Sequence, residues 1–275
     1  MHRKTRSPPP RTPRHHGKMA IDWSAVIWLH CPMDFYALLA KDPRSLSGAC
    51  VAILGGGGKT GLLLRLGAEL AGHHPRVLMT SLTKSSTHIQ PPPLLLHGSG
   101  TVPPLPFDKT NPLMVMSSQI EDGKLLGISP QLLATLLARS SLALVECDGA
   151  RKLPLKAHSM HDPAVPECAT HIVVVVGASV VDTTIEQGLV HRPELFQSLW
   201  GVAPDFQLEV DFIAEVVTSS RGYRTKMPGN QPVIYFINQA DRWPQPARRL
   251  ALAIQARSGD PTFWGSLRNG ELHRL

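Results

Sequence analysis

The stretch VAILGGGGKT at residues 51–60 limits most strongly what this chain can fold into. An apolar run passes through glycines into a Lys-Thr pair and then into a second apolar run, which predicts a strand, a tight loop and a helix. Glycines let successive backbone N–H groups turn toward a phosphate, and the helix start adds its positive end. The stretch therefore predicts a nucleoside triphosphate site made by Gly55, Gly56, Gly57, Gly58, Lys59 and Thr60.

Within this predicted site, Lys59 supplies a mobile cation and the Thr60 hydroxyl binds Mg²⁺. The loop is a short form, Gly-x-x-Gly-Lys-Thr, because the longer phosphate-binding pattern requires glycine where this chain has Ile53. The alternative interpretation is a glycine-rich turn between a strand and a helix, beside a Lys-Thr pair that binds nothing.

Apolar strand patterns alternate with helix patterns along the rest of the chain, which we interpret as one domain at residues 33–275. Further strand patterns lie at 76–80, 113–117, 142–149, 172–176 and 233–237, and helix patterns at 34–40, 59–71, 130–139, 193–200, 208–219 and 244–257. Strands that are apolar throughout predict an α/β fold, a mostly parallel sheet with helices on both faces, of the P-loop NTPase type. In such a sheet the site lies at the carboxyl ends of the strands.

The first 32 residues read as a disordered basic extension. Residues 1–18 are rich in proline, arginine and histidine and cannot bury a core, and a start at Met33 would give a complete domain. Six of the 28 basic residues of the chain lie in these 18 positions, which leaves 22 basic against 21 acidic residues and explains most of the net charge of +7. The domain itself gives no electrostatic reason to expect a nucleic-acid partner.

Cysteine usage and hydropathy bear on the compartment. The four cysteines form no C-x-x-C pair and lack the density of a disulfide scaffold, which favours a reducing cytoplasm. No stretch approaches the roughly 18 apolar residues that a membrane helix needs, so no membrane partner is expected.

Two acids follow the strand pattern at 142–149. Asp148 has the place of a carboxylate that binds Mg²⁺ opposite Thr60, and Glu146, two residues earlier on the same face, could orient water or substrate. Arg151, Lys152 and Lys156 follow and would face anionic groups across the site, and Arg151 would stabilise developing negative charge. The alternative for the two acids is that they only cap the next helix, and the alternative for the basic residues is a charged, solvated loop.

Polar groups also follow two other strands. Thr83, in the segment TSLTK at 80–84, could complete the Mg²⁺ shell or contact a γ-phosphate, with Lys84 beside it. Asn238 and Asp241 resemble the Asn-Lys-x-Asp motif of G-domain proteins, in which the aspartate accepts from N–H groups that guanine has and adenine lacks. Gln239 replaces the lysine, so that both ATP and GTP stay open. Ordinary polar turns are the alternative in both places.

Four residues of types that bind metals lie close together in the sequence: His158, His161, Cys168 and His171. Their spacing imitates a zinc site, but the two halves stand close together and prolines intervene. The pattern leaves open whether they bind a metal.

Six motifs taken together resemble the YqeC family: GGGGKT, TSLTK, ECDGARKLPLKAH, HDPAVP, HRPE and NQAD. Members are described as accessory proteins of selenium-dependent molybdenum hydroxylases. The resemblance implies a phosphate-loop nucleotide-binding fold and a role in maturing the hydroxylase or inserting its cofactor, with the molybdenum cofactor and the apo-hydroxylase as partners. The chain departs from the family at residues 80–84, where members usually have TTTTK, and in the extension before Met33.

Two hypotheses follow. The first is an NTPase or a phosphoryl- or nucleotidyl-transferring enzyme, in which Lys59, Glu146, Asp148 and Arg151 act on the bound nucleotide. The second is a carrier or chaperone for the molybdenum cofactor or its apo-enzyme, in which nucleotide binding without hydrolysis switches the conformation.

Overall fold

The structure is a computed structural model that describes residues 34–86, 89–90, 92–96, 102–120, 123–227, 229 and 231–275. The basic extension predicted at residues 1–32 and the proposed start at Met33 lie outside the described residues.

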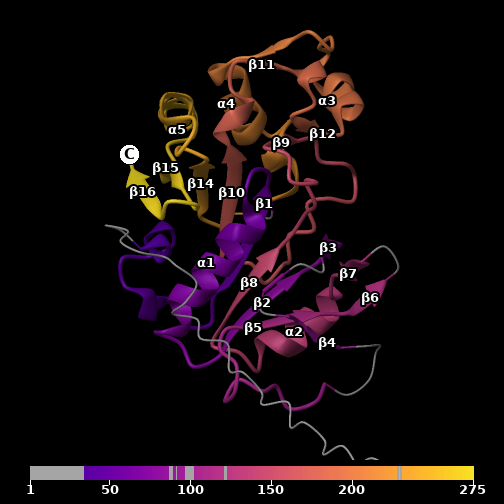
Figure 1. Cartoon of the computed structure of the whole chain (residues 1–275), viewed down its shortest axis with the longest axis vertical. Coiled ribbons are helices and arrows are strands. Elements are labelled where there is room, and N and C mark those ends of the chain that lie inside the picture. Colours follow the sequence, from indigo (N-terminus) through magenta and orange to yellow (C-terminus); the bar gives the residue numbers. More distant parts are fainter. Residues whose placement is uncertain are drawn as a thin grey trace, which may run out of the picture.

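A nine-stranded sheet forms the centre of the described chain (Figure 1). In spatial order its strands are β16 (Glu271–Arg274), β15 (Thr262–Ser266), β14 (Val233–Asn238), β10 (His171–Gly177), β1 (Cys50–Gly55), β8 (Leu142–Glu146), β2 (Val77–Ser81), β5 (Leu113–Met116) and β4 (Leu94–Leu95). All neighbours pair in parallel except β15 and β16. This confirms the predicted mostly parallel sheet, and it puts β1, which leads into the glycine loop, between β10 and β8.

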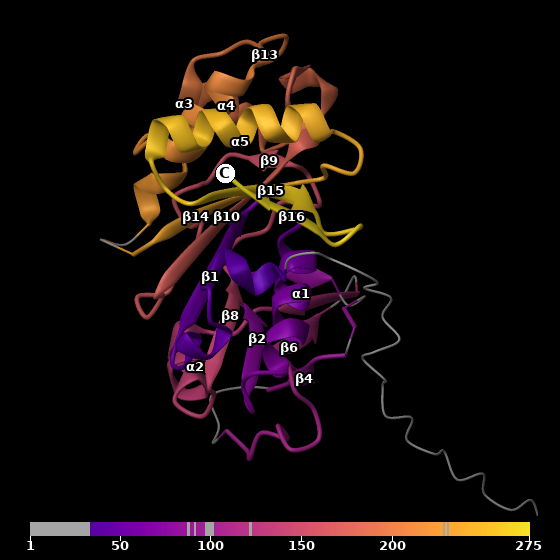
Figure 2. The same ribbon diagram turned by 90° about the vertical axis from the view of Figure 1, so that its left-hand side faces the viewer.

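Both faces of the sheet are buried, as the uniformly apolar strands require. Alternate residues of β1 point to opposite faces, so that Val51 and Ile53 pack with α1 (Lys59–Ala71), whereas Ala52 and Leu54 belong to the core on the other side. The helices that cover this second face are α2 (Pro130–Leu137), α3 (Pro193–Trp200), α4 (Val210–Thr218) and α5 (Pro244–Ser258). Figure 2 shows α1 and α2 on opposite sides of β8 and β2.

Three small sheets, which the sequence patterns did not predict, connect loop segments in the described part of the chain. They are β3 (Ser85–Ser86) and β6 (Ser118–Ile120) on either side of β7 (Lys124–Leu126), β9 (Leu155–Lys156) with β12 (Val190–His191), and β11 (Thr183–Thr184) with β13 (Gln207–Leu208). In Figure 1 the last two pairs gather with α3 and α4 at one end of the molecule. The β9–β12 pair matters most for function, because it holds the loop that follows the acids of β8.

One local prediction needs correction. The helix expected at 34–40 is a single 3₁₀ turn, Phe35–Leu38, in which Ala37 and Leu39 donate to the carbonyls three residues earlier and the Tyr36 N–H donates to Glu69 of α1 at 2.9 Å. At the end of the chain, β15 and β16 form an antiparallel pair, and β16 is an edge strand of the sheet. In the described part of the chain, no helix has both the length and the apolar character needed to cross a membrane.

Candidate functional site

The glycine loop between β1 and α1 is packed too closely for side chains. A Cβ atom at Gly57, where φ is 78°, would stand 2.4 Å from the backbone nitrogen of Gly177 at the end of β10. A Cβ atom at Gly58, where φ is 140°, would stand 2.4 Å from Asn238 Nδ2. The loop also donates a backbone hydrogen bond from Gly57 to the Leu153 carbonyl at 2.9 Å. Only glycine fits both the dihedral angles and the space.

The Lys59 side chain lies inside the loop, where it is only 5% exposed. Its Nζ donates to the Gly55 carbonyl at 2.8 Å and lies 3.2 Å from Asp148 Oδ1 and 3.7 Å from Glu146 Oε1. The lysine and the two acids that the sequence singled out therefore share one buried cluster. Because a buried ammonium is costly unless it is paired, these two carboxylates are what keep the lysine in this position.

The two acids have different partners. Glu146 Oε2 accepts the Thr60 hydroxyl at 2.9 Å, so this carboxylate, at the end of β8, faces the start of α1. Both Asp148 oxygens accept the Gly55 N–H, at 3.2 and 3.0 Å. The sequence predicted that Asp148 would face Thr60, but Glu146 makes that contact. Asp148 lies beyond the last residue of β8, so strand alternation does not set the direction of its side chain.

Asp148 is the centre of a buried cationic environment. It is fully buried, and Lys156 Nζ at 3.4 Å and His158 Nε2 at 2.6 Å join Lys59 around it. Burial alone would raise the pKa of Asp148, but Lys59, His158 and Lys156 outweigh that effect and lower the pKa to about 2. Asp148 is therefore an anion at neutral pH and anchors the glycine loop through Gly55.

Glu146 has the opposite tendency. Its burial raises the pKa of the carboxyl above the ordinary value, and the nearby charge of Lys59 and the hydrogen bond from Thr60 offset only part of that effect. A buried carboxylate with a raised pKa beside a hydroxyl is suited to bind a cation or to exchange a proton. The surroundings of the two neighbouring acids thus raise the pKa of Glu146 and lower that of Asp148.

The start of α1 offers free donors. The backbone N–H groups of residues 58–61 have no acceptor in the described part of the chain, and no side chain there caps the helix. Arg151 and Lys152 lie close by on a turn whose next residue, Leu153, accepts the Gly57 N–H. Both have positive φ, 49° and 66°, and both are exposed. Non-glycine residues held in this region cluster at functional sites, so the turn is a candidate for a functional role.

Asn238 and Asp241 follow β14 on the other side of the loop. Asn238 braces the loop, because its Nδ2 donates to the Gly57 carbonyl at 2.7 Å while its Oδ1 accepts the Leu267 N–H at 3.0 Å. Asp241 accepts the Ser266 hydroxyl at 3.0 Å. Gln239, at φ 76°, turns its side chain toward β10 and accepts the Ser179 N–H at 3.1 Å. Of the two predicted base-reading residues, Asn238 contacts the loop, whereas the partners of Asp241 are Ser266 and Arg268.

The segment after β2 contributes less directly. The Thr80 hydroxyl is buried and donates to the Val115 carbonyl of β5, away from the loop. Thr83 is half-buried, and its N–H donates to Ser81 Oγ at 3.1 Å, while that hydroxyl contacts the Glu146 carbonyl at 3.2 Å. The Ser81 hydroxyl therefore connects Thr83 to the backbone of Glu146, and Thr83 itself does not contact it.

The four residues with zinc-like spacing do not come together, and no group of three or more His, Cys, Asp or Glu side chains able to hold a metal occurs among the residues that the structure describes. His158 contacts Asp148, His171 Nδ1 contacts the Thr170 hydroxyl at 2.9 Å, and Cys168 Sγ lies 3.6 Å from Cys50 Sγ. These side chains have separate partners, which the spacing alone could not reveal.

The sequence did not point to Asp162, and it predicted that Lys156 would face an anionic group, whereas the structure makes the two residues a buried ion pair. Lys156 is fully buried, and its Nζ contacts Asp162 at 2.6 Å in addition to Asp148. Asp162 also accepts Arg192 at 2.8 Å. The sequence signal was the clustering of these residues in the KAH, HDP and HRP motifs, but only the β9–β12 pairing brings the motifs together.

The chain is similar to proteins of one family. The family model described as YqeC protein matches residues 51–194, which include the glycine loop, both acids and the Lys156–Asp162 cluster. A protein from Escherichia coli (strain K12), described as "Uncharacterized protein YqeC", is 29% identical over 199 residues, which cover 69% of this chain and 75% of that protein. No solved structure matches the chain.

Proposed function

Because the chain belongs to the YqeC family, and because of the geometry of its glycine loop, we propose that it binds magnesium and a nucleoside triphosphate, ATP or GTP, at residues 55–60. One observation carries the proposal. The free N–H groups of residues 58–61, the Lys59 ammonium and the Thr60 hydroxyl converge at the start of α1. Converging backbone donors, the positive end of a helix and a lysine are the groups that bind β- and γ-phosphates in phosphate loops.

The metal part of the proposal rests on the oxygen ligands beside the loop. Thr60 and Glu146 supply a hydroxyl and a carboxylate, which are hard oxygen donors that suit Mg²⁺, and Mg²⁺ there would neutralise phosphate charge. A bound phosphate would attract the Lys59 ammonium away from Glu146. Mg²⁺ would then supply the positive charge that Glu146 has lost. Asp148 was predicted from the sequence as the second Mg²⁺ ligand. Its engagement by Gly55, Lys156 and His158 favours Glu146 for that role.

Recognition of the base is proposed for Asp241. Ser266 holds one of its oxygens, and the side chain stays 13% exposed at the carboxyl end of β14. A carboxylate there accepts the two N–H groups of guanine, which favours GTP over ATP. Asp241→Asn replaces half of the acceptor with a donor and is expected to weaken GTP binding at least ~10-fold, the effect of losing a hydrogen bond to a charged group, while ATP binding stays unchanged.

Catalysis is the first of two candidate roles. As an NTPase or a phosphoryl- or nucleotidyl-transfer enzyme, the protein would use Glu146 to orient water or a second substrate and Arg151, on its exposed turn, to stabilise developing charge. The second candidate role is a nucleotide-switched carrier for the molybdenum cofactor or its apo-hydroxylase. A role in maturing a selenium-dependent molybdenum hydroxylase rests in both cases on the family resemblance. Phosphate release or transfer by the isolated protein supports the enzyme, and its absence with and without apo-hydroxylase supports the carrier.

Thermal unfolding with and without Mg-nucleotide tests the binding proposal. A ligand present at 100 times its Kd stabilises the folded state by about 2.7 kcal/mol, and this raises the melting temperature. We expect that rise for the wild type with Mg²⁺ and a much smaller one after Thr60→Val. Thr218→Val is the matched control, because the Thr218 hydroxyl bonds within α4, to Ala214. If neither nucleotide raises the wild-type melting temperature, the proposal fails.

A further inference from the structure

Two cysteines face each other at the end of the sheet that lies opposite the glycine loop. Cys50 is the first residue of β1, and the loop begins at the other end of the same strand. Cys168 lies three residues before His171, the first residue of β10, which is a parallel neighbour of β1. The Sγ atoms of the two cysteines are 3.6 Å apart, although 118 positions separate them in the sequence. The fold thus creates a pair of thiols that no C-x-x-C motif predicts.

Backbone hydrogen bonds hold the two segments at this distance. The Cys50 N–H donates to Thr170 Oγ1 at 3.1 Å, and the Thr170 N–H donates to the Cys50 carbonyl at 2.8 Å. Cys168 lies on a turn that the Ala169 N–H closes by donating to the Pro166 carbonyl at 3.0 Å. The two sulfur atoms of a disulfide are about 2 Å apart. A small rotation of the exposed Cys168 side chain therefore brings the sulfur atoms to bonding distance without a change in the sheet.

The two thiols differ in their access to solvent. Cys168 is exposed, whereas Cys50 is fully buried. Burial, with a smaller contribution from the neighbouring Cys168, raises the pKa of the Cys50 thiol, so that this thiol stays protonated at neutral pH. The thiolate is the reactive form of a cysteine. An oxidant in solution therefore reaches Cys168 first, and Cys50 reacts only with a sulfur that is already attached to Cys168.

We propose that Cys50 and Cys168 form a modification site, at which a small disulfide such as oxidised glutathione converts the two thiols into a reversible intramolecular disulfide. First, the Cys168 thiolate attacks one sulfur of the oxidant, whose S–S bond breaks, and one glutathione leaves as a thiolate. Cys50 then gives its proton to this thiolate, and its sulfur attacks Cys168 Sγ and releases the second glutathione. The cysteines lose two electrons and two protons, and the oxidant takes up both to become two thiols.

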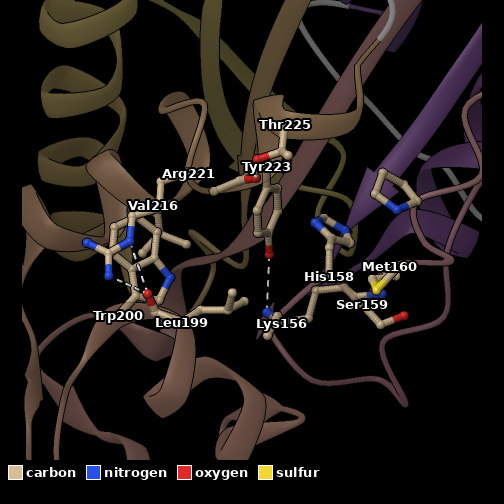
Figure 3. A pocket seen from close by; sticks show the side chains of 13 residues that line it. Lys156, His158, Ser159, Met160, Leu199, Trp200, Val216, Arg221, Tyr223 and Thr225 are labelled. Carbon is tan, nitrogen blue, oxygen red and sulfur yellow. Dashed lines mark hydrogen bonds between the residues drawn. The ribbon is translucent and has the colours of Figure 1, made fainter.

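The thiol pair is separate from the glycine loop and from the pocket of 180 Å³ shown in Figure 3. The lining of that pocket comes from residues 156–163 and 199–225, and none of the described residues in it is a cysteine. The disulfide would join β1 to the segment that leads into β10, and at the far end of β10 Gly177 packs against Gly57. Where thiols are otherwise kept reduced, such a bond is transient and forms in response to oxidation. The inference does not rest on nucleotide binding.

The test treats the full chain with oxidised glutathione, blocks the remaining thiols and identifies the linked peptides by mass spectrometry. We expect the wild type to lose the mass of two hydrogen atoms, to yield one peptide pair that links Cys50 to Cys168, and to recover both thiols in dithiothreitol. Cys147→Ala is the matched control and should form the same bond, because the buried Cys147 thiol donates to the Val145 carbonyl at 3.4 Å instead. Cys50→Ser should stop after the first step and retain one glutathione on Cys168.

Four results would overturn the inference. They are a wild type without any linked peptides in excess oxidised glutathione, a wild type that stops with one glutathione attached, a bond from Cys168 to Cys147 or to Cys31, and loss of the bond in Cys147→Ala. Cys31 lies outside the described residues, so the identity of the linked peptides is what excludes it. The first three results come from wild-type protein alone, and the measurement therefore stays decisive if a variant does not fold.

Discussion

Asp148→Asn is the substitution whose cost follows most directly from the structure. The pKa of Asp148 is about 2, against roughly 3.9 in an unfolded chain, and a difference of that size corresponds to about 2–3 kcal/mol of stability at neutral pH. Asparagine can still accept the Gly55 N–H but carries no charge. Lys59 keeps Glu146 and Lys156 keeps Asp162, so both cations retain one partner. The expected loss in the free energy of unfolding is therefore about 3 kcal/mol, at the low end for a broken buried pair.

The dependence of this loss on pH follows from the sign of the shift. A carboxyl whose folded-state pKa is depressed stabilises the protein above its unfolded pKa, and the stabilisation disappears as the pH falls through its folded pKa. The difference in the free energy of unfolding between wild type and Asp148→Asn, called the gap below, should thus be constant above about pH 5 and become smaller below about pH 4. Urea unfolding monitored by circular dichroism measures the gap, with Asp205→Asn, an exposed acid, as the control. A gap below 1 kcal/mol at pH 7, or one that widens as the pH falls, would refute the reasoning.

Two further substitutions test the packing of the site. Gly57→Ala and Gly188→Ala change glycines of nearly equal φ, 78° and 75°, but only the first puts a Cβ against backbone, that of Gly177, so it alone should lower the melting temperature by many degrees and abolish nucleotide binding. Equal effects would contradict a steric role for the loop glycines. Lys156→Met removes the buried cation from Asp162 and should cost about 3–5 kcal/mol in urea unfolding. A neutral result would mean that the buried charges are not mutually dependent.

The sequence predicted well the elements that strong local patterns define. Helix α1 has the bounds expected at 59–71 and α3 those expected at 193–200, because apolar periodicity and terminal glycine or proline residues mark both ends. The parallel sheet followed from strands without polar alternation. Strand order was not predictable, since the position of β1 between β10 and β8 depends on contacts between distant segments. Strands of two residues, such as β9, leave no periodicity to detect.

The sequence selected the members of the buried cluster beside the glycine loop, but not the contacts between them. Lys59, Thr60, Glu146 and Asp148 were all selected, yet which acid faces Thr60 was not, because the strand ends at Glu146 and its alternation stops there. The partners that occupy Asp148 come from the loop after β8, and nothing in their spacing fixes their direction. Lys156 illustrates this best: it looked like a free cation and is a buried ion-pair partner.

Equilibrium binding of Mg-GTP and Mg-ATP to the full chain, with Lys59→Gln beside it, tests the central claim most directly. Lys59 lies inside the glycine loop, so its ammonium is the charge that a bound triphosphate requires. Saturable one-to-one binding to the wild type, weakened at least ~10-fold in a Lys59→Gln variant with wild-type circular dichroism, is the result we predict from the loss of a charged hydrogen bond. Failure of the wild type to bind either nucleotide, or equal binding by the folded variant, would contradict nucleotide binding at the glycine loop.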